Sequence, residues 1–355
     1  MKKLFKRILI AFGIAIIAFI TFFAGLIILN TVNNYKPEAT LLEHVFPEKA
    51  IKTANKKAYS VLSWNIGYAG LGADADFFYD GGSMARPEKV EYQQYWSGIQ
   101  ELISTNDSLD FILLQEVDIS SKRSYRTNQF NRICDLLPHH TAAFAKNYAV
   151  SYVPVPLFNP LGKVESGLAM FSQYQPESTA QEVFPLNYAW PKSLFMPDRC
   201  FMHSIIPLSS GEKLHIINTH NSAFDDGSLR NAQLNNLFDH MKTLYGPGDY
   251  VVVGGDWNVN PPGYENHSFL SNDIAFRLDF SSPIFEENPD WGIYFDPHFP
   301  TNRDVSTAYQ KGKSPTTIMD FYVCSPNISV LEIKTQYDEF RNADHQGVYF
   351  RFTLD

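Results

Sequence analysis

The sequence from Ile8 to Leu29 contains no charged residue, and this run limits what the N-terminal part of the chain can become. A helix of these 22 residues would be roughly 33 Å long at ~1.5 Å per residue, enough to cross the ~30 Å hydrocarbon layer of a membrane. A secretory signal peptide has a shorter apolar core, about 7–15 residues, followed by small residues at its cleavage site. Here Asn30-Thr-Val-Asn-Asn34 follows the run. The sequence therefore favours an uncleaved transmembrane helix over 8–29.

The charges that flank this run predict its orientation. Residues 1–7 contain four basic side chains, and the cytoplasmic flanks of membrane spans carry an excess of lysine and arginine. We therefore expect 1–7 to be a cytoplasmic segment and the rest of the chain to lie outside the cytoplasm. Residues 30–57 are predicted to form a polar linker that lifts a single globular domain, 58–355, off the bilayer.

The charge of this domain bears on its substrates. The whole chain has a net charge of −9; residues 1–40 contribute +4, so the remainder carries −13. Proteins that bind nucleic acid without sequence preference usually present a basic surface, because neutralising phosphates supplies most of that affinity. The acidic body disfavours a general nuclease, although a local basic groove is compatible with a negative total.

Short apolar runs separated by turns dominate the sequence from residue 58 onward. Several are rich in Val, Ile, Phe and Tyr, as β-strands are. Helical spacing of apolar residues occurs in Glu88–Ser104 and Leu229–Leu244. Strands outnumber the interspersed helices, which predicts two packed sheets with helices outside them and not a simple Rossmann layout. The expected strands are Tyr59–Trp64, Phe111–Gln115, Gly167–Phe171, Cys200–Pro207, Leu214–Thr219, Tyr250–Gly254, Ile318–Cys324, Ile328–Thr335 and Val348–Phe352.

Polar residues that can bind metals or move protons stand at the ends of these strands. Taken singly, each has an ordinary explanation: a turn asparagine, an exposed carboxylate or a structural histidine. Asp256 and Asn258 are harder to explain in this way. They follow the apolar Val251–Gly255 two residues apart, so their side chains point the same way. The segments are Trp64-Asn65, Gln115-Glu116-Val-Asp118, Asn218-Thr-His220, Gly255-Asp256-Trp-Asn258, Asp320 and Asp344-His345.

Together these segments, in this order, resemble the endonuclease/exonuclease/phosphatase superfamily, which includes deoxyribonuclease I and neutral sphingomyelinases. The resemblance covers residues 58–355, and Ser166–Ser172 is similar to the central strand of that family. One departure is Asn221, where the family more often has an apolar residue after the histidine. The resemblance implies an α/β fold, a two-sheet mixed β-sandwich flanked by helices, with its site at one rim. It also implies the activity of a metal-dependent phosphoric-ester hydrolase.

The resemblance also implies a role for each residue. Glu116 is expected to be the principal ligand of a Mg²⁺ or Mn²⁺ ion, because such hard cations prefer oxygen ligands, and Asn65 and Asp344 are expected nearby in the metal and water shell. Asp256 is expected to orient and deprotonate the attacking water, and Asn258 to bind a phosphoryl oxygen. His345 is expected to contact the phosphate, with Asp320 fixing its tautomer. His220 is expected to donate a hydrogen bond or proton on the leaving-group side.

Two arginines are further candidates for substrate binding, and one apolar segment is a candidate for contact with the membrane or the pocket. Arg86, in an Asp/Gly-rich loop, and Arg123, in a loop after Glu116, could contact an anionic part of the substrate; both could equally belong to exposed loops. The segment Tyr148–Pro160 is apolar and rich in proline. It could dip into the bilayer or cover the pocket, but an edge strand or a rigid loop packed on the domain explains it better.

Three functions are compatible with these features. The favoured one is a membrane-anchored phosphoesterase that acts on lipid headgroups or small phosphorylated metabolites. The alternative is an extracytoplasmic metal-dependent nuclease, which the charge of −13 disfavours. A minor alternative is an inactive binding module on the same fold, and the filling of every expected catalytic position argues against it.

Overall fold

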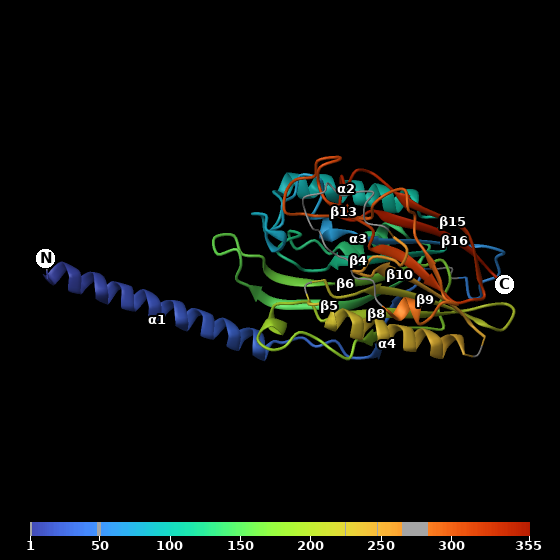
Figure 1. Ribbon diagram of the computed structural model, residues 1–355, viewed down its shortest axis with the longest axis horizontal. Helices are drawn as coiled ribbons and strands as arrows, with labels where there is room; N and C mark the ends of the chain where they lie inside the picture. Colours follow the sequence, from blue (N-terminus) through green and yellow to red (C-terminus); the bar gives the residue numbers. More distant parts are fainter. Residues whose placement is uncertain (1, 48–50, 224, 247, 265–282) are drawn as a thin grey trace.

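Two seven-stranded sheets packed face to face form the body of the protein, as the computed structural model shows (Figure 1). The structure describes residues 2–47, 51–223, 225–246, 248–264 and 283–355. The first sheet has the order β1-β7-β8-β9-β10-β14-β11 and the second β15-β16-β3-β4-β6-β5-β2. In each sheet one central pair is parallel, β9 with β10 and β3 with β4, and the other pairs are antiparallel. The predicted mixed sandwich is confirmed.

The strands of the first sheet are β1 (Thr40–Leu41), β7 (Ser178–Val183), β8 (Cys200–Pro207), β9 (Lys213–His220), β10 (Tyr250–Asp256), β11 (Gly292–Tyr294) and β14 (Asp320–Cys324). Those of the second are β2 (His44–Val45), β3 (Tyr59–Asn65), β4 (Phe111–Asp118), β5 (Thr141–Val153), β6 (Gly162–Ser172), β15 (Ile328–Gln336) and β16 (Gly347–Leu354). A separate ribbon joins β12 (Asn302–Arg303) to β13 (Thr316–Thr317). The helices are α1 (Lys2–Val32), α2 (Lys89–Thr105), α3 (Gln129–Leu136), α4 (Ser228–Tyr245) and α5 (Pro283–Glu286), with three short 3₁₀ turns, η1 (Gly67–Ala69), η2 (Phe78–Asp80) and η3 (Lys192–Leu194).

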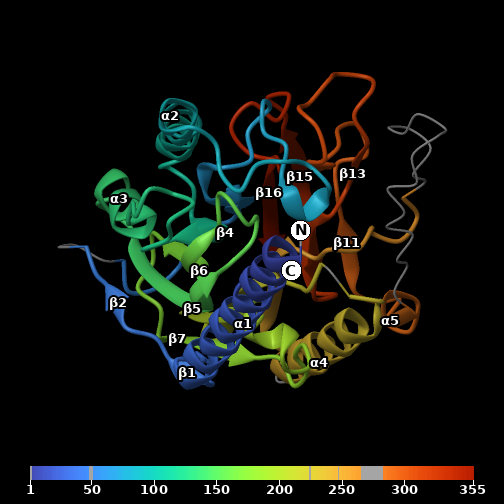
Figure 2. The same cartoon turned by 90° about the vertical axis from the view of Figure 1, so that its left-hand side faces the viewer.

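The central strands are apolar on both faces because both faces are buried. In β4, Phe111 and Leu113 point into the core between the sheets, whereas Ile112 and Leu114 pack on the other side against α2 and α3. Helix α4 covers the outer face of the first sheet in the same way. Figure 2 shows α2 and α3 on one side of the sheets and α4 and α5 on the other.

The helix α1 projects from the body, and its last turns contact the domain (Figure 1). It is long and apolar enough to cross a membrane, a property that signal sequences share. Near its end, Asn30 Nδ2 donates to the carbonyl of Tyr152 in β5 at 2.9 Å. The segment 30–57, which we expected to be a linker, also pairs with the sandwich: β1 adds to one sheet and β2 to the other.

Several elements lie outside those that we expected from the sequence: the strands β1, β2, β5, β7, β11, β12 and β13 and the helices α3 and α5. The residues 148–153 of the apolar segment Tyr148–Pro160 belong to β5, and the remainder connects β5 to β6. Among the residues that the structure describes, only the two-residue β2 pairs with the outer side of β5, so most of β5 is at a sheet edge, as the proline-rich sequence suggested.

Three histidines form a hydrogen-bonded chain, one in α4 and two in the strands β8 and β9 beneath it, away from the rim described below. His215 Nε2 is 3.3 Å from Asp249 Oδ2, so this nitrogen donates and His215 Nδ1 accepts from His203 Nε2 at 2.8 Å. His203 Nδ1 then accepts from His240 Nε2 at 3.3 Å. Burial, followed by the charges of His215 and His240, lowers the pKa of His203 to about 2. The three hydrogen-bonded histidines are therefore uncharged in the folded protein at neutral pH.

This neutral histidine predicts that the fold loses stability in acid. The unfolded chain binds a proton at His203 below about pH 6.5 and the folded chain does not, so stability is complete above that pH and falls as the pH drops toward 2. Between pH 7.5 and 5.0 we expect His203 to contribute about 2 kcal/mol of this loss. Urea unfolding of the detergent-solubilised chain at both pH values measures it. His203→Gln should show a smaller loss between the two pH values and exposed His139→Gln an unchanged one; equal losses in wild type and His203→Gln would disprove the effect.

Candidate active site

The rim of the sandwich collects the strand-end residues because of how the strands pair. The parallel strands β9 and β10 both end there, with His220 opposite Asp256. The antiparallel β14 begins there, with Asp320 opposite Asp256 on the other side. In the second sheet β3 ends at Asn65, and β16 begins just after His345.

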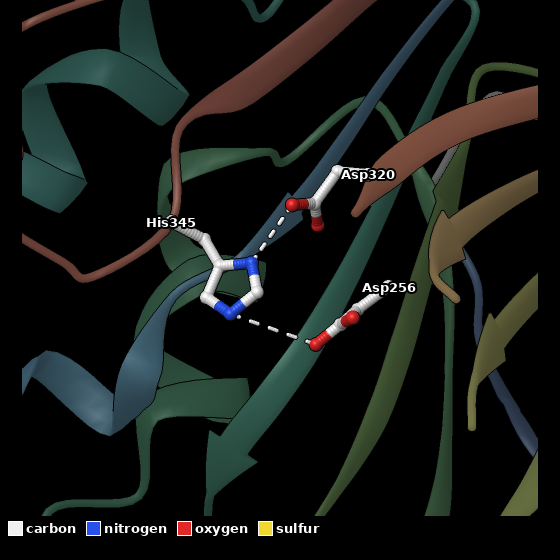
Figure 3. Close-up of side chains that lie close together, drawn as sticks. All are labelled: Asp256, Asp320 and His345. Atoms are coloured by element: carbon white, nitrogen blue, oxygen red, sulfur yellow. Dashed lines mark hydrogen bonds and ion pairs between the residues drawn. The ribbon is translucent and has the colours of Figure 1, made fainter. Parts of the chain in front are cut away.

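Asp256, Asp320 and His345 form the centre of this rim (Figure 3). All three are buried, and one ligand atom from each lies within 4.8 Å of the others. His345 Nδ1 is 2.8 Å from Asp320 Oδ2, and because a carboxylate can only accept, this nitrogen donates. His345 Nε2 therefore faces Asp256 Oδ2, at 3.6 Å.

The two carboxylates determine the charge of His345. Burial alone would lower its pKa, but Asp320 and Asp256 together raise the pKa well above the usual value for histidine. Burial also raises the pKa of Asp320 to about 6, although the positive charge of His345 opposes that increase. The arrangement therefore favours an imidazolium held between two carboxylates at neutral pH.

Asn302 is a contact of His345 that sequence reasoning missed. Its Nδ2 lies 2.8 Å from His345 Nε2, and its buried Oδ1 has no hydrogen-bond partner among the described residues. The amide nitrogen matches a neutral imidazole and the amide oxygen matches an imidazolium, so rotation of this amide satisfies either protonation state. A lone asparagine in the two-residue strand β12 carries no sequence signal of this role.

Asp256 is oriented by groups from β3, from β9 and from the turn that follows β10. Asn65 Nδ2 donates to Asp256 Oδ2 at 3.0 Å, and the backbone N–H of Asn258 donates to Oδ1 at 3.0 Å. His220 Nε2 lies 3.2 Å from Oδ2. The side chain of Asn258 is itself fixed, because its Nδ2 donates to the carbonyl of Asn221 at 2.9 Å.

His220 has a defined tautomer because of Arg199, another residue that sequence reasoning missed. A guanidinium can only donate, so His220 Nδ1, 3.1 Å from Arg199, accepts. The ring proton is then on Nε2, toward Asp256. Burial, followed by the positive charges of Arg199 and His345, lowers the pKa of His220 well below its usual value. His220 is thus suited to donate a hydrogen bond as a neutral ring.

The three residues expected around a metal lie beside this cluster. Glu116 Oε1 is 4.0 Å from His220 Nε2, and Glu116 has a φ of 55°, a strained conformation that places it at an irregularity of the β4–β6 pairing. Asn65 Oδ1 accepts from the N–H of Gly67 at 3.0 Å. Asp344 is buried, and its Oδ1 has no hydrogen-bond partner among the described residues.

These oxygens fit a hard divalent cation. A buried carboxylate oxygen without a partner carries a large desolvation cost, which a bound cation would offset. Burial raises the pKa of Asp344 to about 6; His345 opposes this and Glu116 adds to it. The space beside Asp344 is kept free by Gly67, where a Cβ atom would lie 2.7 Å from Asp344 Oδ1.

A pocket of about 830 Å³, including its open mouth, lies over these residues. Glu116, Asp344, Asp256, Asn258 and His220 line its floor. Its walls are apolar and aromatic, from Tyr68, Phe77, Tyr79, Tyr148, Met196 and Pro197. The wall also contains Asp80, whose pKa is raised to about 7, first by burial and then by Asp344, Asp304 and Glu116.

The two arginines that the sequence suggested occupy different places. Arg123 lines the pocket, but its guanidinium is paired with Asp118 at 3.0 Å and lies 3.5 Å from the centre of the Tyr68 ring. Arg86 donates to Asn159 Oδ1 at 2.7 Å and to the carbonyl of Pro160, and it is not among the lining residues.

A sequence model of the endonuclease/exonuclease/phosphatase family matches residues 62–312, more than half of the chain. The chain belongs to this family. Members of the endonuclease/exonuclease/phosphatase family are generally metal-dependent phosphoesterases, and the oxygen-lined rim agrees with that chemistry. No curated protein matches the chain.

Solved structures of the family share the fold. An endonuclease/exonuclease/phosphatase from Beutenbergia cavernae is 17% identical, with a TM-score of 0.58 over 84% of this chain and 72% of that one. ANGEL2, a 2′,3′-cyclic phosphatase solved with adenosine-2′,3′-vanadate, is 14% identical, with a TM-score of 0.55 over 89% and 99%. The human Nocturnin catalytic domain with a bound sulfate is 16% identical, with a TM-score of 0.51 over 88% and 97%.

Proposed function

We propose that this protein is a membrane-anchored phosphoesterase that uses Mg²⁺ or Mn²⁺ to hydrolyse a phosphodiester or phosphomonoester. The observation that carries the proposal is the unpartnered, buried Asp344 Oδ1 beside Glu116, on the floor of a pocket that His220 and Asp256 also line. Hard oxygen donors next to a charged imidazole suit a phosphate, whose negative charge both the cation and the imidazolium attract.

Glu116 and Asp344, with Asn65 close by, would hold the cation. When bound, the cation would polarise a phosphoryl oxygen and neutralise charge on the leaving group. These residues have rigid supports: Asn65 is fixed between Gly67 N–H and Asp256, and Glu116 lies in the buried strand β4. Such preorganisation is the main contribution that a protein makes to phosphoryl transfer.

Asp256 would orient and deprotonate the attacking water, since the donors around it leave its carboxylate aimed into the pocket. His345, kept positive by Asp320, would contact the phosphate and stabilise the charge of the transition state. Asn258 would bind a phosphoryl oxygen. His220, with its proton on Nε2, would donate a hydrogen bond on the leaving-group side.

The pocket supports a lipid headgroup or a small phosphorylated metabolite as substrate. Its aromatic and apolar walls suit the organic part of such a molecule, and Arg199 and Arg123 are the cations that line it. A nuclease is the second candidate, and the structures of ANGEL2 and Nocturnin show that the fold accommodates an adenosine 2′,3′-vanadate or a sulfate. The charge of −13 outside residues 1–40 favours the first candidate.

The proposed chemistry predicts large losses of turnover in single variants. Glu116→Gln, Asp256→Asn and His345→Ala should each reduce the rate by on the order of 10²–10⁴, as expected for losing a general base or a preorganised charge. The full-length protein in detergent is assayed on sphingomyelin, phosphoinositides, bis(4-nitrophenyl) phosphate and plasmid DNA, with Mg²⁺ and with EDTA.

Exposed Glu177→Gln is the matched control and should keep wild-type turnover. Activity that EDTA leaves intact, or undiminished turnover by His345→Ala, would refute the proposal. Cleavage of DNA alone among the four substrates would establish the nuclease instead.

We also propose that residues 1–7 are cytoplasmic and that the catalytic domain lies outside the cytoplasm, because the basic residues precede the apolar run. Protease added to intact cells or spheroplasts should then digest the domain. Complete protection of the domain in intact cells, with digestion only after lysis, would reverse the orientation.

A further inference from the structure

Two loops at the edge of the pocket expose an unusual amount of apolar surface. One is 154–161, between β5 and β6, and the other is 184–199, between β7 and β8. We call them the apolar rim. Its exposed side chains and their exposed fractions are Phe158 98%, Leu157 66%, Trp190 63%, Leu186 54% and Val155 41%. Single exposed apolar residues are normal on soluble proteins, but a group of large ones marks a contact surface.

The apolar rim lies beside the end of the helix that can cross a membrane. Asn30 of α1 donates to the carbonyl of Tyr152, two residues before the first loop, and α1 also contacts η3 in the second loop. Tyr35, just after α1, donates to the carbonyl of Lys146 at 3.0 Å. Figure 1 shows the β5–β6 connection projecting from the body on the side from which α1 leaves it. A bilayer that holds α1 is therefore close to these loops.

The rim has the side chains that suit a membrane interface. Lys192 lies 4.3 Å from the centre of the Tyr188 ring, next to Trp190, and tyrosine, tryptophan and lysine are the residues enriched at headgroup depth. At the base of the other loop, Arg86 and Lys122 both donate to the carbonyl of Pro160. Both cations contact the loop close in sequence to its exposed Leu157 and Phe158, in an otherwise acidic domain, and positive charge there suits phosphate headgroups.

The same two loops form part of the pocket wall. Leu161 comes from the first, and Met196, Pro197 and Arg199 come from the second. A membrane that covers the tips of the loops therefore reaches the mouth of the pocket, and a lipid headgroup needs to move only along the wall to arrive at Glu116 and Asp256.

We infer that the apolar rim rests in the surface of the bilayer that holds α1, so that the pocket opens at the membrane and takes its phosphate ester from a lipid headgroup. This inference deepens the proposed function and depends on its membrane anchor. It assigns a role to Arg86 that differs from direct substrate binding: with Lys122, Arg86 holds the base of the membrane-contacting loop.

Fluorescence of the full-length protein in phosphatidylcholine nanodiscs tests the contact without relying on catalysis. In a Cys134→Ser background, where the other two cysteines are buried, Phe158→Cys carries the environment-sensitive label NBD. Leu331→Cys is the matched control, because Leu331 is 53% exposed and belongs to β15, a strand that lies away from α1 in Figure 1. We expect blue-shifted emission and quenching by doxyl-labelled lipid at position 158, and quenching only by aqueous iodide at position 331.

Equal access of iodide to both labels, without doxyl quenching at 158, would overturn the inference. A blue shift that occurs in detergent without lipid, together with a doubled mass, would make the rim an interface between two copies and would also overturn it.

A double variant then links the contact to turnover. The double variant Leu157→Ser/Phe158→Ser should hydrolyse sphingomyelin or phosphoinositide in vesicles about tenfold more slowly than the wild type, because apolar contact with the bilayer is lost. Its hydrolysis of soluble bis(4-nitrophenyl) phosphate should be unchanged. An equal loss on both substrates contradicts the inference. If wild type hydrolyses neither, the proposed function fails, whereas the fluorescence result still decides the membrane contact.

Discussion

The register of β10 between β9 and β14 is the constraint on which the site depends. It places Asp256 opposite His220 on one side and opposite Asp320 on the other, so one strand brings three side chains of the candidate site to the same edge. A shift of one residue would turn Asp256 to the opposite face of the sheet. Gly255 allows β10 to approach β9 closely, since a Cβ atom there would lie 2.1 Å from the carbonyl oxygen of Thr219. The apolar Val251–Val253, buried on both faces, holds the strand in that register.

The same edge of the sheet buries charged side chains, and burying a charge lowers the stability of the fold. Asp320 and Asp344 are buried, and burial raises the pKa of each to about 6. His345 compensates the negative charge of Asp320 through a hydrogen bond of 2.8 Å, whereas Asp344 Oδ1 has no hydrogen-bond partner among the described residues. Uncompensated buried charge is destabilising, and sites that retain it are commonly those that bind or react. A cation at Asp344 and Glu116 would relieve this cost and link metal binding to folding.

Much of the sandwich could be predicted from the sequence because its central strands are buried on both faces and read as continuous apolar runs, as in Phe111–Leu114 and Val251–Val253. The strands β5 and β7 were missed because their sequences mix polar, small and apolar residues, as in Ser178–Val183. The strand-end residues of the site were found because each lies at or near one end of a predicted strand. Asn302 and Arg199 were missed because their contacts, with His345 and His220, come from loops and short elements whose path no local pattern specifies.

If segments distant in the sequence converge on one hard cation, the protein should bind Mn²⁺ at the rim, and electron paramagnetic resonance measures this binding directly. We expect saturable binding at pH 7.5 that weakens below about pH 6, where a proton competes for Asp344. Binding should be lost in the Glu116→Gln/Asp344→Asn double variant and retained in Glu177→Gln. Saturable binding of equal strength in the wild type and the double variant, or none in the wild type, would show that these residues do not hold a cation.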